Sequence, residues 1–173
     1  MTTRVVEVSP ERLDGWLERF HANNPEGPQR VAGLERFDHD RLAVLLLRRG
    51  GYAVGVAEAG RLTAHKVGSR YVQSRTAAGG WSQQRFARRR ANQADELVGA
   101  AAEHAVRLLT GIPLEGLVLG GDRALAAALL DEPGLDGIRD LPRRELYDLP
   151  DPRLSVLEHA VDRGRAVRVT IEE

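Results

Sequence analysis

The sequence predicts a single α/β domain with a mixed, largely antiparallel sheet packed by helices. The chain of 173 residues has the length of one ordinary domain. Three strand-like segments follow one another between residues 42 and 73, separated by short glycine-containing turns, which is the pattern of an antiparallel meander. Further along, a buried-type strand, a glycine pair and a helical segment follow in the order typical of an α/β layer.

Residues 1–40 are predicted to form a strand and helix that extend a core of about 42–171. A strand over 4–8 precedes Ser9-Pro10, which resembles a helix N-cap with proline at the first helical position. The following helix ends near Asn23, and its apolar positions recur at three- and four-residue spacing: Leu13, Trp16, Leu17 and Phe20. The polar stretch from there to Asp40 is predicted to be loop.

The meander is predicted to comprise strands 42–48, 52–58 and 62–73. Regular alternation in the third strand places Leu62, Lys66 and Arg70 on one face and Thr63 and His65 on the other. Neither face is purely apolar, so we expect an edge strand that leads toward a functional loop.

A long helix is predicted from Ser82 to about Thr110, because apolar residues between positions 86 and 109 form a seam at helical spacing. After it we expect a strand over 114–119, a turn at Gly120-Gly121, and a helix to Leu130 with Asp122 as N-cap. The remainder reads as a loop over 133–141, a short strand over 144–147, a helix over 151–163 and a closing strand over 167–171.

Positive charge is concentrated in one part of a chain whose formal net charge is +0. No acidic residue lies between Glu58 and Asp95, whereas eight cations do: Arg61, Lys66, Arg70, Arg75, Arg85, Arg88, Arg89 and Arg90. Such clustering is typical of a face that contacts the phosphates of a nucleic acid. The alternative is a solvated helix face in an arginine-rich chain, since Lys66 is the only lysine.

Composition argues against several other classes. With Cys 0, disulfides and cysteine metal sites are excluded, and the five histidines form no close-spaced ligand pair, so we predict no metal and no cofactor. No apolar run approaches the roughly 20 residues needed to span a bilayer, and the N-terminus lacks a secretion signal. We therefore expect a cytoplasmic monomer without membrane contact.

The segment RTAAGGWSQQRFARRRANQ (residues 75–93) joins a glycine loop to the basic run. Ser82 stands where an N-cap belongs, and a helix start followed by arginines favours a nearby anion. Glycines allow close backbone approach. A glutamine amide can orient a water or an ester without placing negative charge beside RNA phosphate, so chemistry here would work through positioning and charge stabilisation.

Residues 52–122 resemble the central domain of archaeo-eukaryotic class-1 peptide release factors. YAVGVAEAGRLTAHKVGS is similar to the strand pair before the catalytic loop, GGWSQQRFARRRANQ to the Gly-Gly-Gln loop and its arginine-rich helix, and LEGLVLGGD to the strand and glycine turn that follow. The resemblance implies a ribonuclease-H-like fold. Because Trp81 stands where the classical factors have glutamine, the form Gly80-Trp81-Ser82-Gln83-Gln84 looks like the compact bacterial branch of the Vms-like release factors.

The resemblance also implies a site. Gln83 after Ser82 matches the glutamine that the Vms-like group needs, Gln84 is a second candidate, and Gly79 and Gly80 let the loop adapt. A register on RFAR would instead align Trp81 with the classical glutamine. The residues expected to hold RNA are Arg70, Arg75, Arg85, Arg88, Arg89 and Arg90, with Trp81 either stacking on a base or packing back on the domain.

The function implied is that of a peptidyl-tRNA hydrolase, an ester hydrolase that frees nascent chains from tRNA on stalled or split ribosomes. Its partners would be peptidyl-tRNA and the peptidyl-transferase centre of the large subunit. Two alternatives remain open: a nuclease that cuts tRNA near its 3′ CCA end, and a ribosome- or RNA-binding module with an inert loop.

Overall fold

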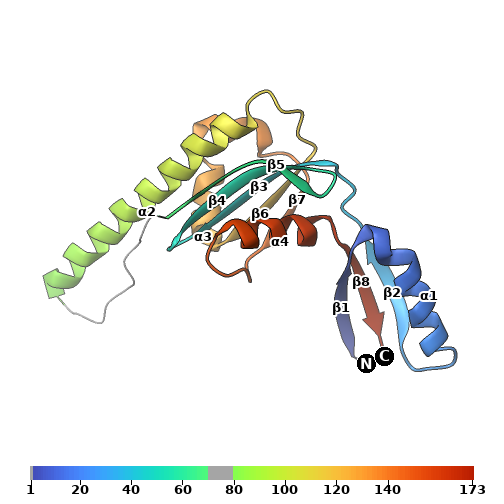
Figure 1. Ribbon diagram of the computed structural model, residues 1–173. Helices are drawn as coiled ribbons and strands as arrows, with labels where there is room; N and C mark the ends of the chain where they lie inside the picture. The colour runs from blue at the N-terminus through green and yellow to red at the C-terminus, as the bar shows by residue number, and fades with distance from the viewer. Residues whose placement is uncertain (1, 70–79) are drawn as a thin grey trace. The chain divides into compact units, whose positions relative to one another are not determined.

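The computed structural model describes residues 2–69 and 80–173, apart from the side chains of residues 81–83 and 86 (Figure 1). The chain divides into two compact units. The terminal unit comprises Met1–His39 together with Asp162–Glu173, and the central unit comprises Asp40–Val161.

The terminal unit is a three-stranded antiparallel sheet with a helix on one face. The sheet order is β1-β8-β2, from strands β1 (Thr3–Val8), β2 (Arg30–Glu35) and β8 (Val167–Glu172). A 3-10 turn, η1 (Pro10–Arg12), with Pro10 at its start, leads into α1 (Leu13–Asn23). The core of the unit joins α1 to the sheet through Val8, Leu13, Phe20, Val167, Val169 and Ile171. The predicted strand, the proline start and the apolar helix face are confirmed.

Strand β2 corrects the prediction of a loop up to Asp40. Its residues are almost all exposed, and its register with β8 shifts between Val31 and Gly33, so no regular alternation appears in the sequence. What makes it a strand is pairing with β8, where Arg30 lies opposite Glu172. Strand β8 also differs from the prediction. It lies between β1 and β2 and is not part of the sheet expected for the 42–171 core.

The central unit contains a five-stranded mixed sheet in the order β5-β4-β3-β6-β7. Strands β3 (Arg41–Arg48), β4 (Gly51–Glu58) and β5 (Arg61–Gly68) form the antiparallel meander, and β6 (Gly116–Gly121) and β7 (Arg143–Leu146) run parallel to β3. The predicted α/β class, the meander and the edge position of β5 are confirmed. The ribonuclease-H-like label stays a prediction.

Helices cover both faces of this sheet, as Figure 1 shows. Helix α2 (Gly80–Leu109), α3 (Arg123–Leu130) and the 3-10 segment η2 (Pro133–Ile138) share one core with β3, β4 and β6. Helix α4 (Leu154–Arg165) packs on the other face, where Leu157 lies against Gly55. Because β3 is covered on both sides, its run from Leu42 to Leu47 is buried throughout.

The prediction of a turn at Gly120-Gly121 is wrong, because both glycines belong to the end of β6. A Cβ on Gly120 would lie 2.4 Å from the carbonyl oxygen of Leu146, and one on Gly121 would lie 2.0 Å from that of Leu47. Gly121 also has a φ of 98°. These glycines therefore permit close strand packing. The N-cap at Asp122 is confirmed, since its carboxylate accepts the amide of Leu125 at 2.9 Å.

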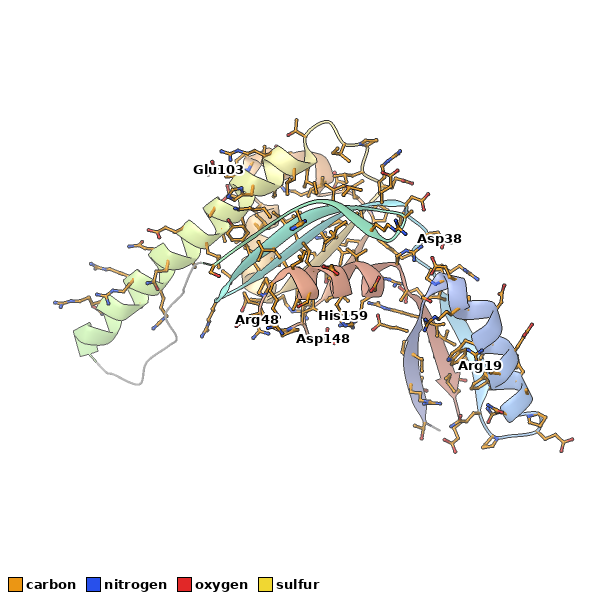
Figure 2. All side chains as sticks on the ribbon, in the orientation of Figure 1. Arg19, Asp38, Arg48, Glu103, Asp148 and His159 are labelled. Carbon is orange, nitrogen blue, oxygen red and sulfur yellow. The ribbon has the colours of Figure 1, made fainter. Side chains whose placement is uncertain are left out.

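At the same end of β3, Arg48 links the β3–β4 turn to the segment before α4. The Arg48 guanidinium donates to the carbonyl oxygen of Leu149 at 2.5 Å and pairs with Asp151 at 3.3 Å (Figure 2). These contacts hold the β3–β4 turn against the segment that precedes α4.

Candidate functional site

Helix α2 has two parts with different surroundings. Its second half is anchored in the core by Leu97, Val98, Ala101, Ala105 and Leu109. Among the described side chains of α2, none before Leu97 is buried. Up to Gln93, none of the described side chains of α2 belongs to the core.

The exposed part of α2 carries a cationic stripe. Arg85, Arg88 and Arg89, here called the arginine stripe, are all exposed, and their three- and four-residue spacing places them on one side of the helix. The first turn contains no acidic residue, and the next acids along the helix are Asp95 and Glu96. Exposed guanidinium groups gathered on one side of a helix favour polyanions such as RNA.

Arg90 is only partly exposed and differs from the stripe. One terminal nitrogen of its guanidinium is buried and, within the part of the chain that the structure describes, has no hydrogen-bond partner. Because this nitrogen is buried, Arg90 differs from the exposed arginines beside it and is not counted in the arginine stripe.

Lys66 is one of the eight clustered cations, although it is not among the residues predicted to hold RNA. The register of β5 shifts between Val56 and Ala57 of β4, so Ala64 pairs with Val56 but Leu62 pairs with Ala57. The shift turns Leu62 away from the α2 face of the sheet. Lys66 pairs with Val54, which belongs to the core shared with α2, so Lys66 is an exposed cation on the α2 side.

The predicted loop residues lie at the start of α2. The helix begins at Gly80, so Ser82 is in its first turn and is not the N-cap, which corrects that prediction. Gln83 and Gln84 follow within the helix, and the Gln84 side chain is exposed.

Some predicted site residues fall outside the described part of the chain. These are Arg70, Arg75 and Gly79, together with the side chains of Trp81, Ser82 and Gln83. Those that the structure brings together are Gln84, Arg85, Arg88, Arg89 and Arg90, all on the first half of α2. Among the described residues, no cluster of three or more His, Cys, Asp or Glu side chains could bind a metal ion. Likewise, none of the described helices combines the length and the hydropathy of a membrane span.

Comparison with known families identifies the chain. A family model of the Actinobacteria/chloroflexi VLRF1 release factors, acVLRF1, matches residues 40–170. The chain belongs to this release-factor family. The membership confirms the resemblance to Vms-like release factors and implies interaction with the ribosome, on which release factors act. No curated protein matches the chain.

The family match begins where the central unit begins, at residue 40, and covers that unit completely. It then continues into the terminal unit as far as residue 170, within β8, and it leaves out residues 1–39. The basic half of α2 and the glutamines therefore lie inside the matched region, whereas α1, β1 and β2 lie outside it.

Proposed function

We propose that this acVLRF1 protein is a peptidyl-tRNA hydrolase that frees nascent chains from tRNA on stalled or split ribosomes. The observation that carries the proposal is that two glutamines in the first turns of α2 are followed directly by the exposed arginine stripe. Membership of a release-factor family supports the reaction class, and the positive charge supports a partner made of RNA.

The division of labour follows from the chemistry of the side chains. The arginine stripe and Lys66 contact phosphates and so hold the start of α2 against ribosomal RNA or tRNA. Gln83, or in second place Gln84, offers a neutral amide to the ester between the peptide and the terminal ribose. Glutamine is not a conventional base, so its contribution is to position water and to stabilise charge on the carbonyl oxygen.

The reaction balances without a cofactor. Water adds to the ester carbonyl carbon, the bond from that carbon to the ribose oxygen breaks, and the ribose oxygen takes up a proton. The products are a peptide with a free carboxylate and a tRNA with an intact 3′ end. Gly79 and Gly80 would let the peptide backbone approach the ester closely.

The test is an analysis of the products from purified 50S subunits that carry peptidyl-tRNA. The proposal predicts that the released peptide has the mass of a chain ending in a free carboxylate and that the tRNA keeps its full length. A peptide that still bears nucleotides would instead show cleavage of the tRNA near its CCA end. Binding to the subunits without any release would identify a non-catalytic RNA-binding module.

A further inference from the structure

A cavity in the terminal unit is lined by aromatic, cationic and amide side chains. It has a volume of about 290 Å³, and the residues that matter here come from α1, from β1 and from the segment before β2: Trp16, Arg19, Phe20, Asn23, Arg4 and Gln29. We call it the aromatic cavity. The α1 residues fall on one stripe of the helix, and Arg4 faces them because it pairs with Ile171, a core residue of the α1 side.

The floor of the aromatic cavity is a fixed aromatic pair. The rings of Trp16 and Phe20 are stacked, with centroids 5.3 Å apart and planes inclined by 13°. Phe20 is buried in the core of the unit, whereas Trp16 is only partly buried. Core packing therefore holds Trp16 in one orientation while part of its surface lines the cavity.

The two arginines at the cavity differ from most others in this unit. Arg30, Arg163, Arg165 and Arg168 pair with carboxylates at 2.6, 2.9, 2.7 and 4.0 Å respectively. Within residues 2–69 and 80–173, Arg4 and Arg19 have no carboxylate within ion-pair distance, and both are exposed. The Arg4 guanidinium donates to the amide oxygen of Gln29 at 3.4 Å. Figure 2 shows Arg19 on α1.

We propose that the aromatic cavity binds one nucleotide of a single-stranded RNA, with the base on Trp16 and the phosphate on Arg4 and Arg19. Stacking on an aromatic ring, a cation for the phosphate and amides for the base edge are the elements by which proteins hold unpaired nucleotides. The amides of Asn23 and Gln29 can both donate and accept hydrogen bonds. An acidic peptide would use the arginines but would leave the ring and the amides without a role.

This site does not depend on the proposed release activity. It lies in residues 1–39, outside the family match, and none of its residues belongs to the arginine stripe. Its occupant would be RNA that the protein meets on its ribosomal partner or elsewhere. The proposal can therefore fail while the hydrolase proposal stands, and the reverse also holds.

The test uses the fluorescence of Trp16. The chain has two tryptophans, so the full-length variant Trp81→Phe leaves Trp16 as the sole tryptophan reporter. In that background we expect the oligonucleotide rA5 to quench the emission saturably. We further expect Arg4→Gln/Arg19→Gln to weaken the affinity at least about tenfold, because charge-assisted bonds to phosphate are lost.

The matched control is Arg12→Gln/Arg36→Gln, which removes two exposed charges from the same unit outside the cavity. The proposal expects this control to bind rA5 like its parent. It is overturned if rA5 gives no saturable quenching, if the two double variants weaken binding equally, or if inorganic phosphate or a pentaglutamate peptide competes as well as rA5. Folding of each variant is checked by its urea midpoint.

Discussion

Removal of charge from the arginine stripe should change the salt dependence of ribosome binding by a calculable amount. Each phosphate neutralised by a protein cation adds about 0.7 to 0.9 to the negative slope of log K against log salt. Arg88→Gln/Arg89→Gln removes two of the three exposed stripe arginines, so the slope should become about 1.4 to 1.8 less steep. Over a fourfold rise in salt, wild type then loses about tenfold more affinity than the variant.

The assay is binding to purified 50S subunits by fluorescence anisotropy over a series of potassium chloride concentrations. The control is Arg107→Gln/Arg153→Gln, which makes the same change in net charge at exposed positions away from the start of α2. Arg107 lies at the far end of α2, paired with Glu103 at 2.5 Å (Figure 2). A slope unchanged by the stripe substitutions, or changed equally by the control, would refute the assignment.

Three further predictions concern stability, measured by urea denaturation. Gly121→Ala should lower the free energy of unfolding by at least about 2 kcal/mol, because a φ of 98° is strained for alanine and its Cβ would meet the Leu47 carbonyl. Asp122→Ala should cost about 0.5–2 kcal/mol through loss of the α3 N-cap, and Asp122→Asn should restore most of it. Hydrogen bonding from Arg165 lowers the pKa of Glu11, so Glu11→Gln should be less stable than wild type at neutral pH by under about 1 kcal/mol. That difference should disappear as the pH falls through the folded-state pKa of Glu11, because wild type then loses the same charge; a difference that persists in acid would contradict it.

Elements with local signals could be predicted from the sequence. The meander is one, because its strands are separated by short turns and the run from Leu42 to Leu47 is apolar enough to be covered on both faces. The second half of α2 is another, since Leu97, Ala101 and Ala105 recur at helical spacing and all lie in the core. The N-cap at Asp122 is a third, because its carboxylate accepts the amide of Leu125, only three residues further along the chain.

Features that depend on distant partners could not be predicted. Strand β2 exists because β8, more than a hundred residues later, pairs with it, and its own exposed side chains carry no alternation. The register shift in β5 is set by how it pairs with β4, so the orientation of Leu62 and Lys66 cannot be read from alternation. Gly120 looked like part of a turn because the oxygen of Leu146 that requires a glycine there belongs to another strand.

The same distinction between local signals and distant partners applies to the candidate sites. The arginine stripe was predictable because clustered charge is a property of the sequence, and Arg85, Arg88 and Arg89 are exposed on one side of α2. The sequence predicts that α2 begins at Ser82, two residues after its actual start at Gly80, because serine is a favourable N-cap residue. The aromatic cavity of the terminal unit was not foreseen, because three separate segments contribute to it and each has an ordinary composition.

The central claim is that a glutamine at the start of α2 acts on the ester while the arginines hold the RNA. The most direct test compares wild type, Gln83→Ala and Gln84→Ala for binding to 50S subunits that carry peptidyl-tRNA and, separately, for peptide release from them. We predict that Gln83→Ala binds like wild type but releases peptide at least about a hundredfold more slowly, as expected for the loss of a positioned amide, and that Gln84→Ala has a smaller effect. Release by Gln83→Ala at the wild-type rate would contradict the assignment. Full release by the double variant Gln83→Ala/Gln84→Ala in the same assay would contradict the claim itself.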